Sequence, residues 1–379
     1  MRILHTSDWH LGRQFHNVSL LDDQRYALEQ VMTIIRARQV DVVLVAGDIY
    51  DRSVPPAGAV ELLDWTVHTI CHELKVPLIL IAGNHDGPQR LAFGCRQLAE
   101  AGLHIVGPLQ REWRPVVLAK DGAEVAFYPI PYCEPGTVRQ VFEVEVSSHD
   151  AAQAFLLEQV RRHNGTERPC VVIGHCFLAG GEVSESERPL SLGGADQVSP
   201  EHFRGFAYAA LGHLHGPQQR GAGHVRYSGS LLKYSFSEEH QRKGVTLVEL
   251  DAAGHASIEQ IPLLPRHDLR TLEGSLTELL AAGATDPGRD DYLLVRLTDH
   301  HAILDVMSKL REVYPNVLHL ERPGLMGRGE AAQVGRERLK LGELAMFEDF
   351  FDQVAGEPLS DEQRTMISAT IEALHREVE

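Results

Sequence analysis

Short apolar runs alternate with longer amphipathic stretches along the first two-thirds of the chain. The runs are rich in Val, Ile and Leu, and each ends in a polar cluster: Ile3–Thr6, Val40–Ala46, Pro77–Ala82 and Cys170–Ile173. Between the first three runs, Leu20–Arg38 and Ala57–Leu74 place apolar side chains at helical spacing. Strands that alternate with helices in this way predict a largely buried α/β sheet.

The pattern also predicts hairpin structure. Val116–Leu118 and Glu124–Ile130 flank Asp121-Gly122, a dipeptide typical of a hairpin turn. Three further β runs follow: Phe206–Leu211, Gly244–Leu250 and Ala256–Leu264. At 379 residues the chain exceeds one ordinary core, so we expect more than one structural unit.

The composition changes at Pro265-Arg266. The segments after it follow β-α-β-α-β order: Asp268–Glu273, a helix from Ser275, Tyr292–Leu297, a helix near Ala302–Val313, and Val317–Glu321. We interpret residues 266–322 as a small separate domain that follows a main domain of residues 1–265. Residues 323–341, which hold Pro, Gly and basic residues but few large apolar ones, are interpreted as a linker.

The last segment, residues 342–379, carries two helix patterns. The first has an apolar stripe made of Leu344, Phe347, Phe351 and Val354. The second begins with a capping box formed by Ser360 and Gln363. The stripe either folds back on the main core or docks on a partner protein, and the Gly-containing linker before it favours docking.

The chain is acidic, with 36 Lys and Arg against 53 Asp and Glu and a formal net charge of −17. An acidic surface repels nucleic-acid phosphates at long range. A nucleic-acid substrate would therefore require bound metal, a local basic surface or a partner subunit.

The five cysteines show no CxxC spacing. The sequence also shows no signal peptide and no apolar run near about 18 residues. These features predict a cytoplasmic protein with reduced thiols and no membrane association.

Polar clusters follow the apolar strands, at the point where each strand ends. They are Asp8-Trp9-His10, Gly47-Asp48, Gly83-Asn84-His85-Asp86, Gly174-His175 and Gly212-His213-Leu214-His215. Ligand sites in α/β sheets form beyond the carboxyl ends of strands, so these clusters can converge on one site. Each cluster alone is ordinary turn chemistry, but their joint occurrence after strands favours a shared metal site.

The residue types in these clusters suit a pair of divalent cations. Carboxylate and amide oxygens with imidazole nitrogens, and without thiolate, suit manganese, iron or zinc better than a structural zinc finger. Two cations roughly 3.5–4 Å apart share a bridging carboxylate and clamp the attacking and leaving oxygens of a phosphoester. Asp48 is the expected bridge because it follows the glycine at the end of a buried strand.

The motif order D-x-H, G-D, G-N-H-D, G-H and G-H-x-H resembles the calcineurin-like metallophosphoesterase family. Four longer segments are similar to the SbcD family, the nuclease subunits of bacterial SbcC–SbcD complexes: Met1–Gly12, Gly47–Asp51 with Pro55-Pro56, Ala82–Asp86 and Tyr227–Ser230. The resemblance is strong over residues 1–265 and extends to the remainder in architecture only. It implies an α/β fold, a two-sheet metallophosphoesterase sandwich flanked by helices, with a small α+β capping domain and C-terminal partner-binding helices.

The same resemblance implies a role for each site residue. One cation would be held by Asp8, His10, Asp48 and His215, and the other by Asp48, Asn84, His175 and His213. His85 would stabilise the transition state or protonate the leaving oxygen, and a water or hydroxide between the cations would be the nucleophile. Ligand type and family both favour manganese.

Three groups have open interpretations. Asp51, where some relatives carry histidine, either contributes to the site or only orients a neighbour. Asp86 either orients His85 or caps a helix at Pro88, and its Asp-Gly-Pro context favours the cap. The third group either contacts phosphate or, as is commoner for scattered charge, forms a solvated face: Lys233, Arg242 and Lys243.

The leading function hypothesis is a metal-dependent DNA nuclease that acts as an exonuclease on double-stranded ends and as an endonuclease on single strands or hairpins. The resemblance implies DNA and an SbcC-type ATPase as partners in DNA repair and recombination, with the ATPase bound by the C-terminal helices. It also implies a homodimer formed through helices near Ala57–Leu74 and Pro88–Gly102, although the apolar faces of these helices could equally pack on the sheet.

Two alternatives remain at this point. A phosphoprotein phosphatase or small-nucleotide phosphodiesterase is one, although Ser53 follows Arg52 where such phosphatases usually carry glycine. A scaffold subunit without catalysis is the other, although all the expected ligands and His85 are present.

Overall fold

The structure, a computed structural model, describes residues 1–165, 168–187, 196–301, 303–323, 344–345, 347–348, 351 and 358–378. The chain divides into two compact units, Met1–Arg266 and His267–Glu379. Within the described residues, no helix is long and apolar enough to cross a membrane.

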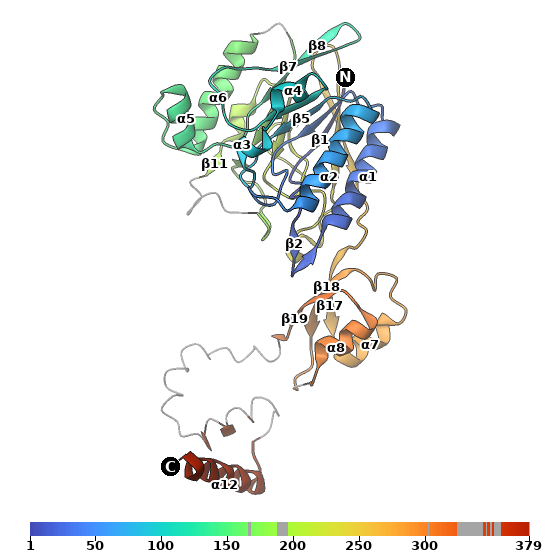
Figure 1. The fold of residues 1–379 in the computed structure, drawn as a ribbon, viewed down its shortest axis with the longest axis vertical. Helices are drawn as coiled ribbons and strands as arrows, with labels where there is room; N and C mark the ends of the chain where they lie inside the picture. The colour runs from blue at the N-terminus through green and yellow to red at the C-terminus, as the bar shows by residue number, and fades with distance from the viewer. Residues whose placement is uncertain are drawn as a thin grey trace. The chain divides into compact units, whose positions relative to one another are not determined.

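Two six-stranded sheets form the first unit (Figure 1). The first sheet contains, in spatial order, β16 (Ala256–Pro262), β15 (Gly244–Leu250), β1 (Arg2–Thr6), β4 (Val42–Val45), β5 (Leu78–Ile81) and β6 (Leu103–Val106). The last four of these strands are parallel, and β15 and β16 extend the sheet antiparallel. The predicted α/β sheet is thus confirmed, since the early apolar runs form its central strands.

The second sheet contains, in spatial order, β13 (Gln218–Gln219), β14 (Val225–Tyr227), β12 (Tyr208–Gly212), β9 (Cys170–His175), β8 (Ala123–Pro129) and β7 (Val116–Lys120). Its four central strands are parallel. The β7–β8 hairpin is confirmed, with Lys120 paired to Ala123. Asp121 and Gly122 between them have φ angles of 52° and 81°, as a two-residue turn of the primed type requires.

The main core lies between the two sheets. Ile3, Val42 and Ile79 of the first sheet join Phe127, Val171 and other buried residues of the second in one cluster. Burial on this scale is the principal stabilising contribution to the sandwich. On the outer side of the second sheet, a second cluster packs the strands against α5 (Pro135–Phe142) and α6 (His149–Asn164).

Helices α1 (Leu21–Ala37) and α2 (Ala57–Val67) lie side by side over the first sheet (Figure 1). The predicted helix Ala57–Leu74 divides into α2 and a π-helical turn, η1 (His68–Glu73). The region Pro88–Gly102 forms two short helices, α3 (Pro88–Leu91) and α4 (Cys95–Ala99), because Gly94 between them adopts a left-handed conformation. Short elements complete the unit: β2 (Gln14–Phe15), β3 (Val18–Ser19), β10 (Phe177–Leu178), β11 (Gln197–Val198), η3 (Pro200–Phe203) and η4 (Phe236–Glu238).

The second unit begins with the predicted β-α-β-α-β set. A parallel sheet of β17 (Leu269–Gly274), β18 (Tyr292–Leu297) and β19 (Val317–Glu321) packs on α7 (Leu276–Gly283) and α8 (Val306–Val313). Ser275 and Glu278 form a reciprocal capping box at the start of α7. This arrangement explains why the helix begins where the sequence predicts.

The tail contains α12 (Asp361–Val378). Ser360 and Gln363 bond reciprocally at its start, which confirms the predicted capping box. Residues 324–341 of the expected linker lie outside the described residues, as does Val354 of the expected apolar stripe.

Candidate metal centre

The polar clusters that follow strands lie together at one edge of the two sheets. β1, β4 and β5 are neighbours in the first sheet, and β9 and β12 are neighbours in the second. Side chains at or just beyond their carboxyl ends converge: Asp8, His10, Asp48, Asn84, His175, His213 and His215. The structure therefore brings together all seven residues expected to bind metal.

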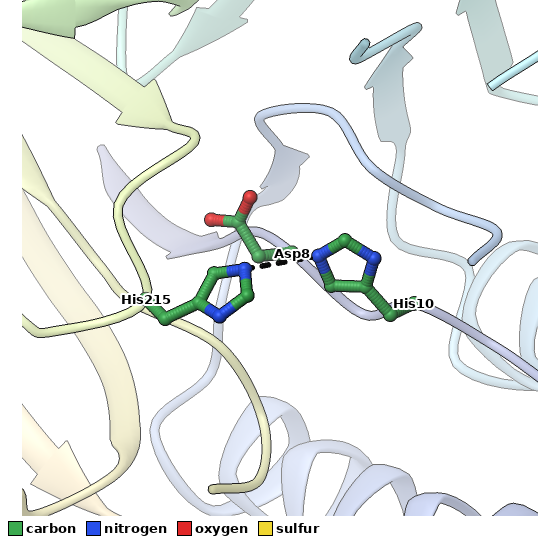
Figure 2. A group of neighbouring side chains, drawn as sticks. All are labelled: Asp8, His10 and His215. Carbon is green, nitrogen blue, oxygen red and sulfur yellow. Dashed lines mark hydrogen bonds between the residues drawn. The ribbon is translucent and has the colours of Figure 1, made fainter. Parts of the chain in front are cut away.

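Ligand-capable atoms within 4.8 Å of one another form the groups Asp8–His10–His215 and Asp8–Asp48–His175. Figure 2 shows the first group, in which the Nε2 atoms of His10 and His215 are 3.0 Å apart. Asp8 belongs to both groups and so links the two sides of the cluster.

Asn84 connects the histidines of the second sheet to this cluster. Its Oδ1 atom lies 2.9 Å from Nε2 of His175 and 3.3 Å from Nδ1 of His213. The Oδ2 atom of Asp48 lies 3.5 Å from Nε2 of His175 and 3.7 Å from Nε2 of His10. Asp48 thus lies between histidines of both sheets, where a bridging carboxylate is expected.

The backbone is strained where the first sheet supplies its side chains. Asp8, His10 and Asp48 have φ angles of 52°, 45° and 50°. Non-glycine residues rarely adopt this left-handed region, and such strain concentrates at functional sites. Hydrogen bonds between the two turns hold the conformation: the N–H of Asp8 donates to Gly47 at 3.0 Å and that of His10 to Asp48 at 2.9 Å.

Close approach of the chain explains one glycine of the motifs. A Cβ atom on Gly83 would lie 2.1 Å from Oδ1 of Asp48 and 2.3 Å from its backbone nitrogen. Only glycine allows the loop after β5 to come this near to the carboxylate of Asp48.

Burial and neighbouring charges set the ionisation of the two aspartates. Burial raises the pKa of Asp8 to about 6, although the positive charges of His175 and His215 oppose this rise. Burial would also raise the pKa of Asp48, but His175 and His10 hold it well below the ordinary value for a carboxyl group. Asp48 is therefore ionised at neutral pH and ready to bind a cation.

Burial and neighbouring charges also give His175 and His213 very different pKa values. Burial lowers the pKa of His175, but the charge of Asp48 and a hydrogen bond to it dominate and raise the value to about 9. Burial and the nearby charge of His175 lower the pKa of His213 to about 3. Without a cation His175 carries a proton, whereas His213 is already neutral.

The residues fit a divalent-metal centre. They supply carboxylate, amide and imidazole donors without a thiolate, which is the donor set of manganese, iron or zinc enzymes. All seven are buried except Asn84, which is half-buried. Within the part of the chain that the structure describes, the buried Nδ1 of His10 has no hydrogen-bond partner.

Comparison with known proteins agrees with this chemistry. The profile of the calcineurin-like phosphoesterase family matches residues 1–217, more than half of the chain. The SbcD subunit of the SbcCD nuclease of Staphylococcus epidermidis is 33% identical over 368 residues, which cover 97% of each chain. The same subunit of Staphylococcus saprophyticus is 32% identical over 378 residues, which cover 100% of this chain and 99% of the relative.

The chain belongs to the SbcD family of calcineurin-like phosphoesterases. Residues 265–355 also match a profile described as the type 5 capsule protein repressor C-terminal domain. Family membership makes the chain a metal-dependent phosphoesterase, and it accounts for both the two-sheet fold and the donor cluster at its edge.

His85, which the SbcD resemblance marks as the acid, lies against the cluster. Its backbone N–H donates to Oδ1 of Asp48 at 2.9 Å, and its ring is 4.7 Å from that of His10. Its Nδ1 is 2.9 Å from the carbonyl oxygen of Asp51. Because a carbonyl only accepts, Nδ1 carries the hydrogen, and Nε2 is the ring nitrogen outside this bond.

Asp51 lies beside the cluster at its half-buried rim. Its Oδ1 is 3.7 Å from Nδ1 of His10 and 3.4 Å from Arg13. Together with His10 and His85 it forms a further group of ligand-capable atoms within 4.8 Å of one another. The Asp51 carboxylate is within ion-pair distance of the His10 ring but is not hydrogen-bonded to it, and its backbone carbonyl accepts a hydrogen bond from the ring of His85.

The structure corrects both interpretations of Asp86. Its carboxylate accepts the backbone N–H groups of Ile49 at 3.1 Å, Tyr50 at 2.9 Å and Gly83 at 2.9 Å. It does not cap α3, whose N-cap is Gly87 without a side-chain bond. The local Asp-Gly-Pro pattern suggested a helix cap. Instead, the carboxylate oxygens accept buried backbone N–H groups from the loops after β4 and β5.

Two sets of supporting residues were not identified from the sequence. Gln24 is fully buried in α1, and its Nε2 donates to the carbonyl of His10 at 2.8 Å while its Oε1 accepts from Gly12 at 3.1 Å. The available signal was a polar side chain on the apolar face of a helix. A polar position on a buried face usually has a specific hydrogen-bonding role.

The second set corrects the interpretation of Lys243 as part of a solvated face. Lys243 is 6% exposed and its Nζ is 2.5 Å from Oε2 of Glu238, which is fully buried. The two residues are close in sequence, but they match no motif, and their contacts with Ser186 and His215 come from other parts of the chain.

Proposed function

We propose that this chain is the nuclease subunit of a two-component complex and cleaves DNA phosphodiester bonds, as an exonuclease at double-stranded ends and an endonuclease on single strands or hairpins. One observation carries the proposal. His85 is held against the candidate bridging Asp48 at the centre of a seven-residue donor cluster, in a chain similar over its whole length to proteins named as nuclease subunits.

Asp8, His10, Asp48 and His215 would hold one divalent cation, and Asp48, Asn84, His175 and His213 the other. When bound, such cations supply Lewis acidity to a phosphodiester and to the attacking water. Manganese is the proposed metal because the donors are oxygens and imidazoles.

The residues around the cluster then position and protonate the substrate. His85 is half-buried and so reaches both the cluster and an incoming phosphodiester. With Nδ1–H fixed on the Asp51 carbonyl, the protonated ring presents Nε2–H to the leaving oxygen of the cleaved bond. Proton donation in this position contributes roughly 10²–10⁴-fold to rate in characterised enzymes.

We further propose an SbcC-type ATPase as the partner, bound through the C-terminal helices. The net charge of −17 makes unaided binding to DNA unfavourable, and a DNA-binding partner would overcome it. On α12, Met366 is 69% exposed, as an apolar side chain in a docking helix would be without its partner.

A homodimer is also proposed. Apolar side chains remain exposed on α2 and on the α3–α4 segment: Val60 at 45%, Phe93 at 87% and Leu98 at 37%. Exposed apolar side chains that cluster on neighbouring elements mark interaction surfaces.

The five cysteines are free thiols, which supports a reducing, cytoplasmic setting.

The test is digestion of linear double-stranded DNA in the presence of manganese, by the native chain and by His85→Ala, with a chelator control. Degradation by the native chain alone supports the nuclease proposal. Hydrolysis of a generic phosphodiester without degradation of DNA, even with an SbcC-type ATPase added, would assign the site to small substrates.

A further inference from the structure

A buried charged cluster lies behind His215. Glu238 and Lys243 are 0% and 6% exposed, and they form an ion pair of 2.5 Å. A buried ion pair is weak evidence for stability, because its desolvation cost offsets most of the attraction. Its location next to the candidate metal centre indicates another role.

Both members of the pair reach His215. The hydroxyl of Ser186 bonds to Oε1 of Glu238 and lies 2.5 Å from Nδ1 of His215. Nζ of Lys243 donates to the carbonyl oxygen of His215 at 2.8 Å. The pair therefore contacts the ring through Ser186 and the backbone directly.

The direction of the hydrogen bonds fixes the His215 tautomer. An ionised carboxylate only accepts, so the Ser186 hydroxyl donates to Glu238. The hydroxyl oxygen then accepts from His215, which places the hydrogen on Nδ1. The opposite tautomer would leave the oxygens of Ser186 and Glu238 in contact without a hydrogen between them. Nε2 keeps its lone pair and faces the centre, 3.0 Å from Nε2 of His10.

Two more residues of the same loop complete the contact. Glu187 accepts the backbone N–H of His215 at 2.8 Å through Oε1 and the Ser184 hydroxyl at 2.5 Å through Oε2. Ser184 also lies 3.1 Å from Oε1 of Glu238. We call Ser184–Glu187 the clasp. It holds both the ring and the backbone of His215.

His213 lies two residues away and is held differently. Its N–H donates to Asp8 at 2.9 Å, and its ring nitrogen lies 3.3 Å from Asn84. These contacts involve other residues of the centre rather than the clasp. The two histidines of one motif should therefore respond differently to changes in the clasp.

We propose that Glu238, acting through the clasp, and Lys243, acting on the backbone carbonyl of His215, are positioning residues that hold His215 in the tautomer and orientation required to bind one of the two cations. This proposal rests on the proposed metal centre, but not on DNA as the substrate. According to the proposal, the affinity for one cation, and not for both, depends on the hydrogen bonds that link Glu238, Ser186 and His215. Partners that orient a metal-binding histidine contribute about 10–100-fold to metal affinity in known sites.

The decisive variant is Ser186→Ala, with Ser186→Thr as the conservative rescue. Ser199→Ala is the matched control, because its half-buried hydroxyl accepts the backbone N–H of Glu201 and is not bonded to the clasp, to Glu238 or to His215. Manganese binding to the full chain is measured by calorimetry, and electron paramagnetic resonance distinguishes single manganese ions from a coupled pair.

For Ser186→Ala we expect one cation to bind as in the native chain and the other to bind about 10–100-fold more weakly. The coupled signal should give way to a single-ion signal at limiting manganese. Ser186→Thr should restore both affinities, and Ser199→Ala should leave both unchanged. Native affinity for both cations in Ser186→Ala, or equal weakening of both, would overturn the proposal.

A second variant guards against loss of folding. E238Q/K243M removes both charges together, so that neither is left buried without its partner. It should reproduce the selective loss of one cation. No step of the test uses DNA, so a failed nuclease assay with intact two-cation binding would reject the proposed function and leave this inference standing.

Discussion

The two sheets supply the candidate metal centre by different means. The first sheet provides Asp8 and Asp48 on left-handed turns, where backbone conformation sets the direction of each carboxylate. The second sheet provides imidazoles whose outer nitrogens are bonded elsewhere, as His175 is to the carbonyl of Ala46 at 2.8 Å and His215 to Ser186 at 2.5 Å. Backbone geometry thus places Asp8, Asp48 and the ring of His10, and it contributes at His213, whose φ is 104°. Hydrogen bonds to the outer ring nitrogen place His175 and His215.

Each sheet also has its own buried carboxylate behind the centre. Asp86 accepts three backbone N–H groups and so joins the loops after β4 and β5. Glu238 accepts hydroxyl groups and pairs with Lys243, behind the loop after β12. The first arrangement stabilises a loop conformation, and the second sets a tautomer. Substitutions in the two regions should therefore fail in different ways.

The largest effect is expected where the regions meet, at Asp48. In Asp48→Ala both cations lose a donor, and His175 and His10 lose the carboxylate that faces them. Turnover should fall on the order of 10⁴-fold or more, and bound manganese measured by elemental analysis should fall with it. A variant that keeps two cations per chain would show that Asp48 is not the bridge.

Gly83→Ala tests whether backbone approach controls the first-sheet region. The added methyl group would lie 2.1 Å from Oδ1 of Asp48, so the carboxylate or the loop must move. A displacement near 1 Å costs about 10²-fold in rate, which steady-state assays on a phosphodiester would detect. Gly223→Ala is the control, because its added methyl group meets nothing within 4 Å. Equal activity of the two variants would show that the approach has no functional importance.

Asp86→Asn separates stability from chemistry. The amide keeps one acceptor oxygen but presents a donor to at least one of the three N–H groups. An unsatisfied buried donor costs about 1–3 kcal/mol, so the free energy of unfolding of the metal-free chain in urea should fall by that amount. The exposed Asp64→Asn serves as the control. Unchanged stability with lost activity would mean that Asp86 acts on the chemistry directly.

These differences explain which features the sequence predicts. The metal-binding candidates stand directly after apolar strands, and the parallel strands of one sheet end at one edge, so the pattern is sufficient to group Asp8, Asp48 and Asn84. The pattern does not show how the second sheet packs, which is what brings His175 to the same edge. Asp86 and Glu238 act through partners distant in the chain, such as Tyr50 at a separation of 36 residues and Ser186 at 52. No local pattern encodes such contacts.

Lys243 is a further residue whose role the local sequence does not predict. A lysine in a polar stretch is usually solvated, and only tertiary structure shows that Glu238 pairs with it in the core. For Asp86, Glu238 and Lys243, contacts with other parts of the fold determine the role of the side chain, and the neighbouring sequence does not. Conversely, the hairpin at Asp121-Gly122 was predictable because its geometry depends on those two residues alone.

The smallest predicted effect is a pH dependence of manganese affinity, which arises because His175 must release a proton when it binds a cation. The pKa of His175 is raised to about 9 in the metal-free chain, so its ring is protonated at neutral pH and must lose that proton to bind a cation. Asp48, with a pKa well below the ordinary value, has no proton to lose. Manganese affinity should therefore rise about tenfold per pH unit between roughly pH 7 and 9 and level off above that range.

The slope should steepen below pH about 6, because Asp8 has a raised pKa of about 6 and then also competes with the cation for a proton. Calorimetry in two buffers of different ionisation enthalpy at pH near 7.5 measures the number of protons released, and close to one is expected. An affinity that does not change between pH 7 and 9, with no proton released, would show that His175 is already neutral. Another group would then balance the charge of Asp48. In that case Asp48 and His175 would not differ in whether they must lose a proton before they bind a cation.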